Sequence, residues 1–193
     1  SVEYVFTSSD EWVYTLRPKL TVRYQIGGAA PATLTPTRTN TPIVVTTATP
    51  TATRPLTGSP TIVVLQQGQD NYSWTRDTYL SSWLAQTNNG DGAEMYCRSD
   101  GALSPLIRFE MHHLPTDIYI TEATLQLYIS TAGYHPMAIE ACQVLKRWYE
   151  MEATWHKATQ STSWTVPGCN GIETDHAALP ADMQSVADGG QWV

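Results

Sequence analysis

Residues 106–111, read LIRFEM, carry the alternation that decides the fold class. The apolar side chains Ile107, Phe109 and Met111 fall on one face of an extended chain, and the charged side chains between them fall on the other. A period of two predicts a strand with one buried face.

The same pattern recurs along the chain. Residues 19–26 (KLTVRYQI) and 123–129 alternate in the same way. Further strands are predicted at 2–6, 62–65, 77–83, 94–98, 137–145 and 191–193. The continuous apolar run 62–65 suits a strand buried on both faces, and short helical turns are predicted at 150–155 and 181–186. Many short strands at regular turn spacing predict an all-β, antiparallel β-sandwich or barrel.

A tract rich in threonine and proline, residues 31–60, divides the chain. Proline removes backbone donors and fixes φ, so the tract is expected to favour polyproline II over helix or central strand. The predicted organisation is terminal strands over 1–26, a linker over 27–61 and a β-sandwich over 62–193. Within the linker, Ile43–Val45 is an apolar run that could add an edge strand to a neighbouring sheet.

The composition of the tract is typical of O-glycosylated stalks, and an unmodified flexible linker is the alternative. A separate Asn-Tyr-Ser sequon offers an N-glycosylation site. The glycosylation candidates are Thr35, Thr37, Thr47, Thr49, Thr51 and Asn71.

The overall charge argues against a nucleic-acid partner. The chain has 193 residues with a net charge of -7, and nucleic-acid binding needs a basic face. No apolar run is long enough to span a bilayer, so no transmembrane segment is predicted. Low charge with many hydroxyl and aromatic residues favours an extracellular or cell-surface β protein.

Three cysteines lack the spacing of a metal knuckle. Cys97 and Cys142 both lie in strand-like runs and are the candidate disulfide, whereas Cys169 lies in a turn. The loop acids Asp70, Asp77, Asp91 and Asp100 could hold a structural calcium, although no EF-hand spacing is present. No other cofactor is expected.

No residue pattern predicts an enzyme. No nucleophile elbow occurs, and Asp175-His176 lies in a loop without a nucleophile motif. Glu150 and Glu152 are neighbouring acids in one turn, which is more typical of a solvated face than of a glycosidase pair. His112 and His113, if on a strand, would point to opposite faces, which argues against a shared metal. A polar turn before Leu114-Pro115 is the favoured interpretation.

The tryptophans allow two interpretations. Exposed rings are platforms for sugar faces, and buried rings fill the core of a small sandwich. Trp74 and Trp164, flanked by serine and threonine, are the carbohydrate-binding candidates. Trp155 and Trp192 are expected to be structural.

Several segments together resemble the DNRLRE domains, a carbohydrate-binding-module-like family of secreted bacterial proteins. The segments are LQQGQDNYSWTRDTYLSSW, YCRSDGALSPLIRFEMHHLP, ITEATLQLYI, VLKRWYEMEATW and WTVPGCNGIETD, in that order. The resemblance covers about residues 62–193 and implies a jelly-roll-like β-sandwich without catalytic residues. Residues 17–22, RPKLTV, resemble the last strand of the same family.

In this chain the RPKLTV segment comes before the tract and not after the sandwich. The resemblance also implies further strands that are expected to follow residue 193. Residues 1–26 are therefore expected to complete the sheet of a domain, either their own or a neighbour's. Pairing with a neighbour is favoured, because a proline-rich tract resists looping, and it would build a head-to-tail filament of copies. The expected function is a non-catalytic structural or adhesive repeat; the alternative is a carbohydrate-binding module of a secreted enzyme that degrades polysaccharide.

Overall fold

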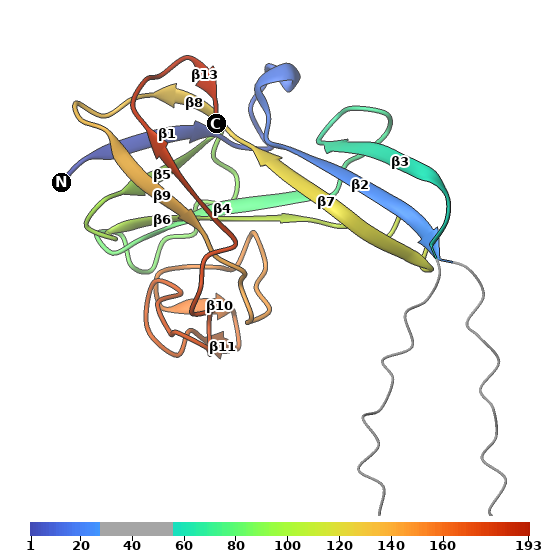
Figure 1. Ribbon diagram of the computed structural model, residues 1–193. Helices are drawn as coiled ribbons and strands as arrows, with labels where there is room; N and C mark the ends of the chain where they lie inside the picture. The colour runs from blue at the N-terminus through green and yellow to red at the C-terminus, as the bar shows by residue number, and fades with distance from the viewer. Residues whose placement is uncertain (28–55) are drawn as a thin grey trace, which may run out of the picture.

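The computed structural model describes residues 1–27 and 56–193, which form an all-β fold (Figure 1). The predicted O-glycosylation sites and the Ile43–Val45 strand lie outside the described residues. One short 3-10 helix, η1, covers Tyr14–Leu16. The strands are β1 Glu3–Thr7, β2 Lys19–Gly27, β3 Leu56–Gln66, β4 Thr75–Ser81, β5 Glu94–Arg98, β6 Leu103–Phe109, β7 Ile118–Gln126, β8 Tyr128–Thr131, β9 Met137–Ala141, β10 Lys157–Thr159, β11 Thr162–Ser163, β12 Asp182–Val186 and β13 Gln191–Trp192.

The strands pair antiparallel in five groups. The largest group has the order β13-β8-β1-β5, and the second has the order β3-β2-β7. The pairs β4-β6, β9-β12 and β10-β11 complete the ladders. Strands β7 and β8 are separated by one residue, Leu127, so nearly continuous chain passes from the second group into the first (Figure 1). Within the described ranges, no helix has the length and hydropathy that a bilayer crossing requires.

The buried side chains show how these groups face one another. One apolar cluster joins Phe6 on β1 and Met95 on β5 to Val186 on β12, so the first sheet packs on the β9-β12 pair. A second cluster joins Val22 on β2 to Phe109 on β6, so the second sheet packs on the β4-β6 pair. Two layers with apolar inner faces constitute a β-sandwich, as the alternation predicted.

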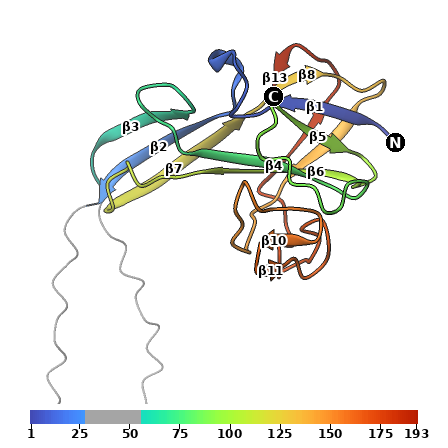
Figure 2. The ribbon, with the colours of Figure 1, turned by 180° about the vertical axis from the view of Figure 1, so that it is seen from behind.

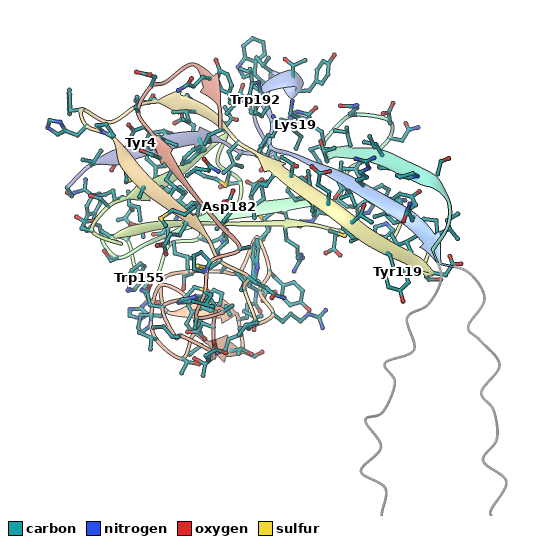
Figure 3. All side chains as sticks on the ribbon, in the orientation of Figure 1. Tyr4, Lys19, Tyr119, Trp155, Asp182 and Trp192 are labelled. Carbon is teal, nitrogen blue, oxygen red and sulfur yellow. The ribbon has the colours of Figure 1, made fainter. Side chains whose placement is uncertain are left out.

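A lobe of irregular chain, residues 142–181, covers the outer side of the β4-β6 pair (Figure 1). Trp148 and Trp164 from the lobe are buried against Leu80 on β4 and Leu106 on β6. Trp155, labelled in Figure 3, packs at the margin of the same cluster. Strand β6 is therefore covered on both faces, and its predicted polar face lies toward the lobe, where Arg108 donates to the Trp148 carbonyl at 2.9 Å.

Both N-terminal strands pair within their own chain. Strand β1 lies between β5 and β8, with Tyr4 opposite Cys97 and Phe6 opposite Ile129. Strand β2 lies between β3 and β7 (Figure 2). The preference for pairing with a neighbour was wrong for this structure, because the chain supplies partners for both edges of each strand. Gly27 is paired with Leu56, so the described residues on either side of the 28–55 gap lie side by side.

Three other local predictions need correction. Residues 181–186 were expected to be a helical turn, but Asp182–Val186 is strand β12, because every residue of it pairs with β9. Residues 150–155 form a non-helical turn. The run 62–65 is not buried on both faces: β3 ends its sheet, and 62% of the Ile62 surface is exposed.

Candidate carbohydrate-binding groove

The connection between β1 and β2 is held in place by hydrogen bonds at several points. The Ser8 amide donates to the Ala93 carbonyl at 3.0 Å, and its hydroxyl donates to the Gly92 carbonyl at 2.6 Å. The Ser9 amide donates to the carboxylate of buried Asp77 at 2.8 Å. A loop fixed in this way presents its side chains in one arrangement before any ligand arrives.

Trp12 projects from this connection into solvent. Its side chain is 86% exposed, which leaves a large apolar ring face uncovered. The backbone on either side is fixed, because Arg17 donates to the Glu11 carbonyl at 2.5 Å and the Val13 amide donates to the Glu11 carboxylate at 3.1 Å. An exposed indole on a fixed loop is suited to stack on the apolar face of a sugar ring.

Trp12 forms one wall of a groove of about 430 Å³, which we call the Trp12 groove. The rings of Tyr79 on β4 and Tyr96 on β5 also line it and lie 5.0 Å apart at 53°. The groove therefore combines apolar ring surface with hydroxyl groups. Its side-chain lining comprises Glu11, Trp12, Tyr79, Asn89, Asp91, Glu94 and Tyr96.

The charge of the groove is negative. Glu11, Asp91 and Glu94 contribute carboxylates, and no lysine or arginine belongs to the described lining. Glu94 accepts a hydrogen bond from the Tyr96 hydroxyl at 2.8 Å, which together with burial raises the pKa of Tyr96 to about 12. Carboxylates accept hydrogen bonds from sugar hydroxyls, and they repel anionic ligands.

The loop carrying Asn89 and Asp91 is fixed by the lobe. The Asn88 amide group donates to the carbonyls of Glu150 and Ala153 at 2.7 and 2.8 Å. At Gly90, a Cβ atom would lie 2.3 Å from the Glu150 carbonyl oxygen, so a larger residue does not fit. The groove thus draws on chain from the first loop, β4, the 84–92 loop and β5.

Comparisons with protein-family models, curated proteins and solved structures found no match.

The structure places the two predicted sugar-binding tryptophans differently from expectation. Trp164 is 4% exposed, and its indole donates to the Thr154 carbonyl inside the lobe, so it cannot offer a face to a ligand. Trp74 is half-buried at a second groove of about 530 Å³. Its ring is flanked by the rings of His112 and His113, with centroids at 4.8 and 4.1 Å. Those histidines lie in a turn before Leu114, as predicted, and their ring centroids are 4.1 Å apart.

The four candidate calcium ligands are not brought together. Asp77 is buried beneath the Ser9 amide, Asp91 lies in the Trp12 groove, and Asp100 is paired with Arg98 at 3.1 Å. Asp70 lies on the exposed loop before β4 with φ of 48°. Among the residues that the structure describes, no three acidic, histidine or cysteine side chains gather as a metal site requires. Asn71 of the sequon is exposed on that same loop, so its glycosylation stays a prediction.

The three cysteines are free thiols in the structure. Cys97 and Cys142, the predicted pair, both line a cavity of about 410 Å³ that Cys169 also lines. Burial raises the pKa of Cys97 to about 11 and, with the nearby Asp175 carboxylate, that of Cys169 to about 12. High thiol pKa values oppose formation of the thiolate that disulfide exchange needs.

The acids considered for catalysis have structural partners. Glu150 accepts from the Asp77 amide at 2.8 Å, and Glu152 accepts from the Gln160 amide at 2.8 Å. Asp175 is fully buried and accepts from Lys146 at 2.7 Å. Burial alone would raise the pKa of Asp175, but this ion pair and the backbone donors around the carboxylate hold it well below its usual range. Asp175 therefore stabilises the conformation of the lobe.

Sequence reasoning missed Trp12, Tyr79 and Tyr96, and it named Asp91 only as a calcium candidate. The sequence did contain a signal for Trp12. This residue follows the turn-rich stretch Thr7–Glu11 and precedes an Arg-Pro pair. Both features predict that Trp12 lies in a connection between strands. The two tyrosines carried no such signal, because their contact joins two different strands, β4 and β5, and depends on how those strands are placed.

Proposed function

We propose that this chain is a non-catalytic β-sandwich module that binds carbohydrate in the Trp12 groove. The observation that carries the proposal is a tryptophan ring, 86% exposed, on a hydrogen-bonded loop beside a groove of tyrosines and carboxylates. The resemblance to carbohydrate-binding-module-like domains supports the same class of ligand. An extracellular location follows from this proposal and stays a prediction.

The charge of the groove narrows the ligand class. Three carboxylates without a lysine or arginine in the described lining favour neutral or amino sugars over uronic or sulfated sugars. The aromatic rings of Trp12, Tyr79 and Tyr96 in the lining suit stacking on the sugar rings of a glycan. The side-chain oxygens of Asp91 and Glu11 would accept hydrogen bonds from its hydroxyl groups.

The test is binding of soluble neutral, amino and anionic glycans by the intact chain, measured by calorimetry, with Trp12→Ala as the variant. We expect Trp12→Ala to weaken binding by about tenfold or more, equivalent to roughly 1.4 kcal/mol of lost stacking. The substituted side chain is exposed, so the fold should be unchanged. The control is Tyr134→Ala, which removes another fully exposed ring from outside the groove.

Equal binding by the Trp12→Ala variant and the intact chain would remove the Trp12 groove as the site. A preference for anionic glycans would contradict the charge argument. Loss of binding in Trp74→Ala alone would move the site to the groove beside His112 and His113.

A structural or adhesive role as a self-assembling repeat is the second proposal. Residues 1–26 are paired in their own chain, so their exchange no longer supplies the contact between copies. Such assembly needs another surface.

A further inference from the structure

The outer face of strand β5 continues beyond the Trp12 groove. Met95 and Cys97 point inward, where they join the apolar cluster against the β9-β12 pair. Because side chains alternate along a strand, Glu94, Tyr96 and Arg98 share the opposite face. Glu94 and Tyr96 line the Trp12 groove, and Arg98 follows on the same face, roughly 7 Å further along the strand. The surface that borders the groove therefore extends toward the other end of β5.

Trp83 lies at that other end. The Arg98 guanidinium lies 4.6 Å from the centroid of the Trp83 ring, a cation-π contact that orients the indole. Salt bridges with Glu3 at 3.4 Å and Asp100 at 3.1 Å fix the guanidinium and balance its charge. Trp83 is nevertheless 60% exposed, so much of its surface is open to a ligand.

Aromatic rings therefore accompany β5 from one end to the other. Hydrogen bonds from Ser8 place the Trp12 loop just before the first residue of the strand. The ring pair of Tyr79 and Tyr96 lies beside the middle of the strand, and Trp83 lies beside its last residue. We call these four rings the β5 aromatic row. The strand itself spans roughly 13 Å, a length that takes several sugar rings to cover.

We infer that the carbohydrate ligand is an extended glycan chain that follows the β5 aromatic row, with a second stacking site at Trp83. This inference rests on the proposed function of the Trp12 groove. A β-1,4-linked chain of neutral, glucose-type sugars fits the row, because equatorial linkages give a nearly straight ribbon whose ring faces are apolar. Arg98 offers little attraction to anionic sugars, since two carboxylates already pair with it.

The probes are cello-oligosaccharides and N-acetylated chito-oligosaccharides of two and six units, titrated into the intact chain by calorimetry. In the series that binds, we expect the hexasaccharide to bind at least about tenfold more tightly than the disaccharide, because only the longer chain reaches Trp83. Trp83→Ala should remove most of this gain and keep the disaccharide affinity of the Trp12 groove. Trp12→Ala should weaken the binding of both lengths.

Two further variants separate ring stacking from general apolar contact. Trp83→Phe keeps an aromatic ring and should retain part of the gain. Leu84→Ala removes a neighbouring side chain that is 57% exposed, and it should leave the affinity for both lengths unchanged. In NMR spectra, the indole N–H signal of Trp83, identified by its loss in Trp83→Phe, should shift when the hexasaccharide is added.

Equal affinity for the two lengths, or an unchanged hexasaccharide affinity in Trp83→Ala, would overturn this inference and leave the Trp12 groove as a binding site. The absence of binding in both series would also overturn it, whereas binding of another glycan in the Trp12 groove would keep the proposed function. Equal binding of both lengths by Trp12→Ala and the intact chain would instead contradict the proposed function itself.

Discussion

At the scale of single residues, burial sets the chemistry of the acid that anchors the Trp12 loop. Asp77 is 1% exposed, and burial raises its pKa to about 7 in spite of the hydrogen bond from Ser9. The Glu150 carboxylate and Asp10 add to the shift. Burial also raises the pKa values of Asp10 and Glu150 themselves. The acids beneath the groove therefore favour their protonated forms more than exposed acids do.

A pH dependence of stability follows from Asp77. Its folded-state pKa of about 7 lies above the ordinary value of 3.8, so the folded chain holds the proton over that interval and the unfolded chain does not. The free energy of unfolding should therefore fall as pH rises from 3.8 to about 7, and level off above. Asp77→Asn keeps an oxygen to accept from Ser9 but cannot ionise, so this part of the decline should disappear.

Urea unfolding at several pH values across this interval measures the effect. Asp188→Asn, at an exposed position, is the control and should leave the slope of the intact chain unchanged. An identical decline with pH in Asp77→Asn and the intact chain would show that Asp77 does not hold the proton.

At the scale of elements, loops as well as strands form the Trp12 groove. The 84–92 loop contributes Asn89 and Asp91 to the Trp12 groove, and its path is set by contact with the 149–154 turn. Gly90 lies against the backbone of Glu150 in that turn, where a Cβ atom does not fit. The lobe therefore supports the groove without lining it.

Gly90→Ala should disturb this support. The added Cβ atom would lie 2.3 Å from the Glu150 carbonyl oxygen. A shift of either backbone would strain the hydrogen bonds that Asn88 makes with the Glu150 carbonyl and the Gly90 amide. We expect a loss of stability of roughly 1–3 kcal/mol together with weaker glycan binding. Thermal unfolding and calorimetry measure the two effects.

Gly92→Ala is the matched control in the same loop, because its added Cβ would meet its nearest neighbour at an ordinary 3.5 Å. Equal stability of the two variants would mean that the contact between loop and turn does not constrain the groove.

At the scale of the whole molecule, the first 27 residues hold the two layers together. Strand β1 is central in one sheet and β2 is central in the other. Phe6 contributes to the cluster between the first sheet and β9-β12, and Val22 contributes to the cluster under the second sheet. Removing these strands would leave inner edges unpaired in both of these sheets.

Deletion of residues 1–26 should therefore abolish cooperative unfolding and cause aggregation, and a synthetic peptide of residues 1–26 added in trans should restore the fold. Circular dichroism and light scattering follow both changes. Cooperative unfolding of the truncated chain without the peptide would contradict a central role for β1 and β2.

The sequence by itself determined the all-β class and several strands, because a period of two is a local property. The alternation at 19–26 and the run at 94–98 correspond to β2 and β5 almost residue for residue. Strand β12 escaped sequence reasoning because its conformation depends on pairing with β9, about forty residues earlier.

Only the tertiary structure decided which aromatic rings are exposed. Trp164 has the polar neighbours of an exposed residue, yet the lobe folds over it and leaves it 4% exposed. Trp12 is followed by the apolar Val13, yet its ring is 86% exposed. The structure likewise decided that the N-terminal strands pair in their own chain. Exposure and pairing are set by segments distant in sequence, and the local pattern carries no information about them.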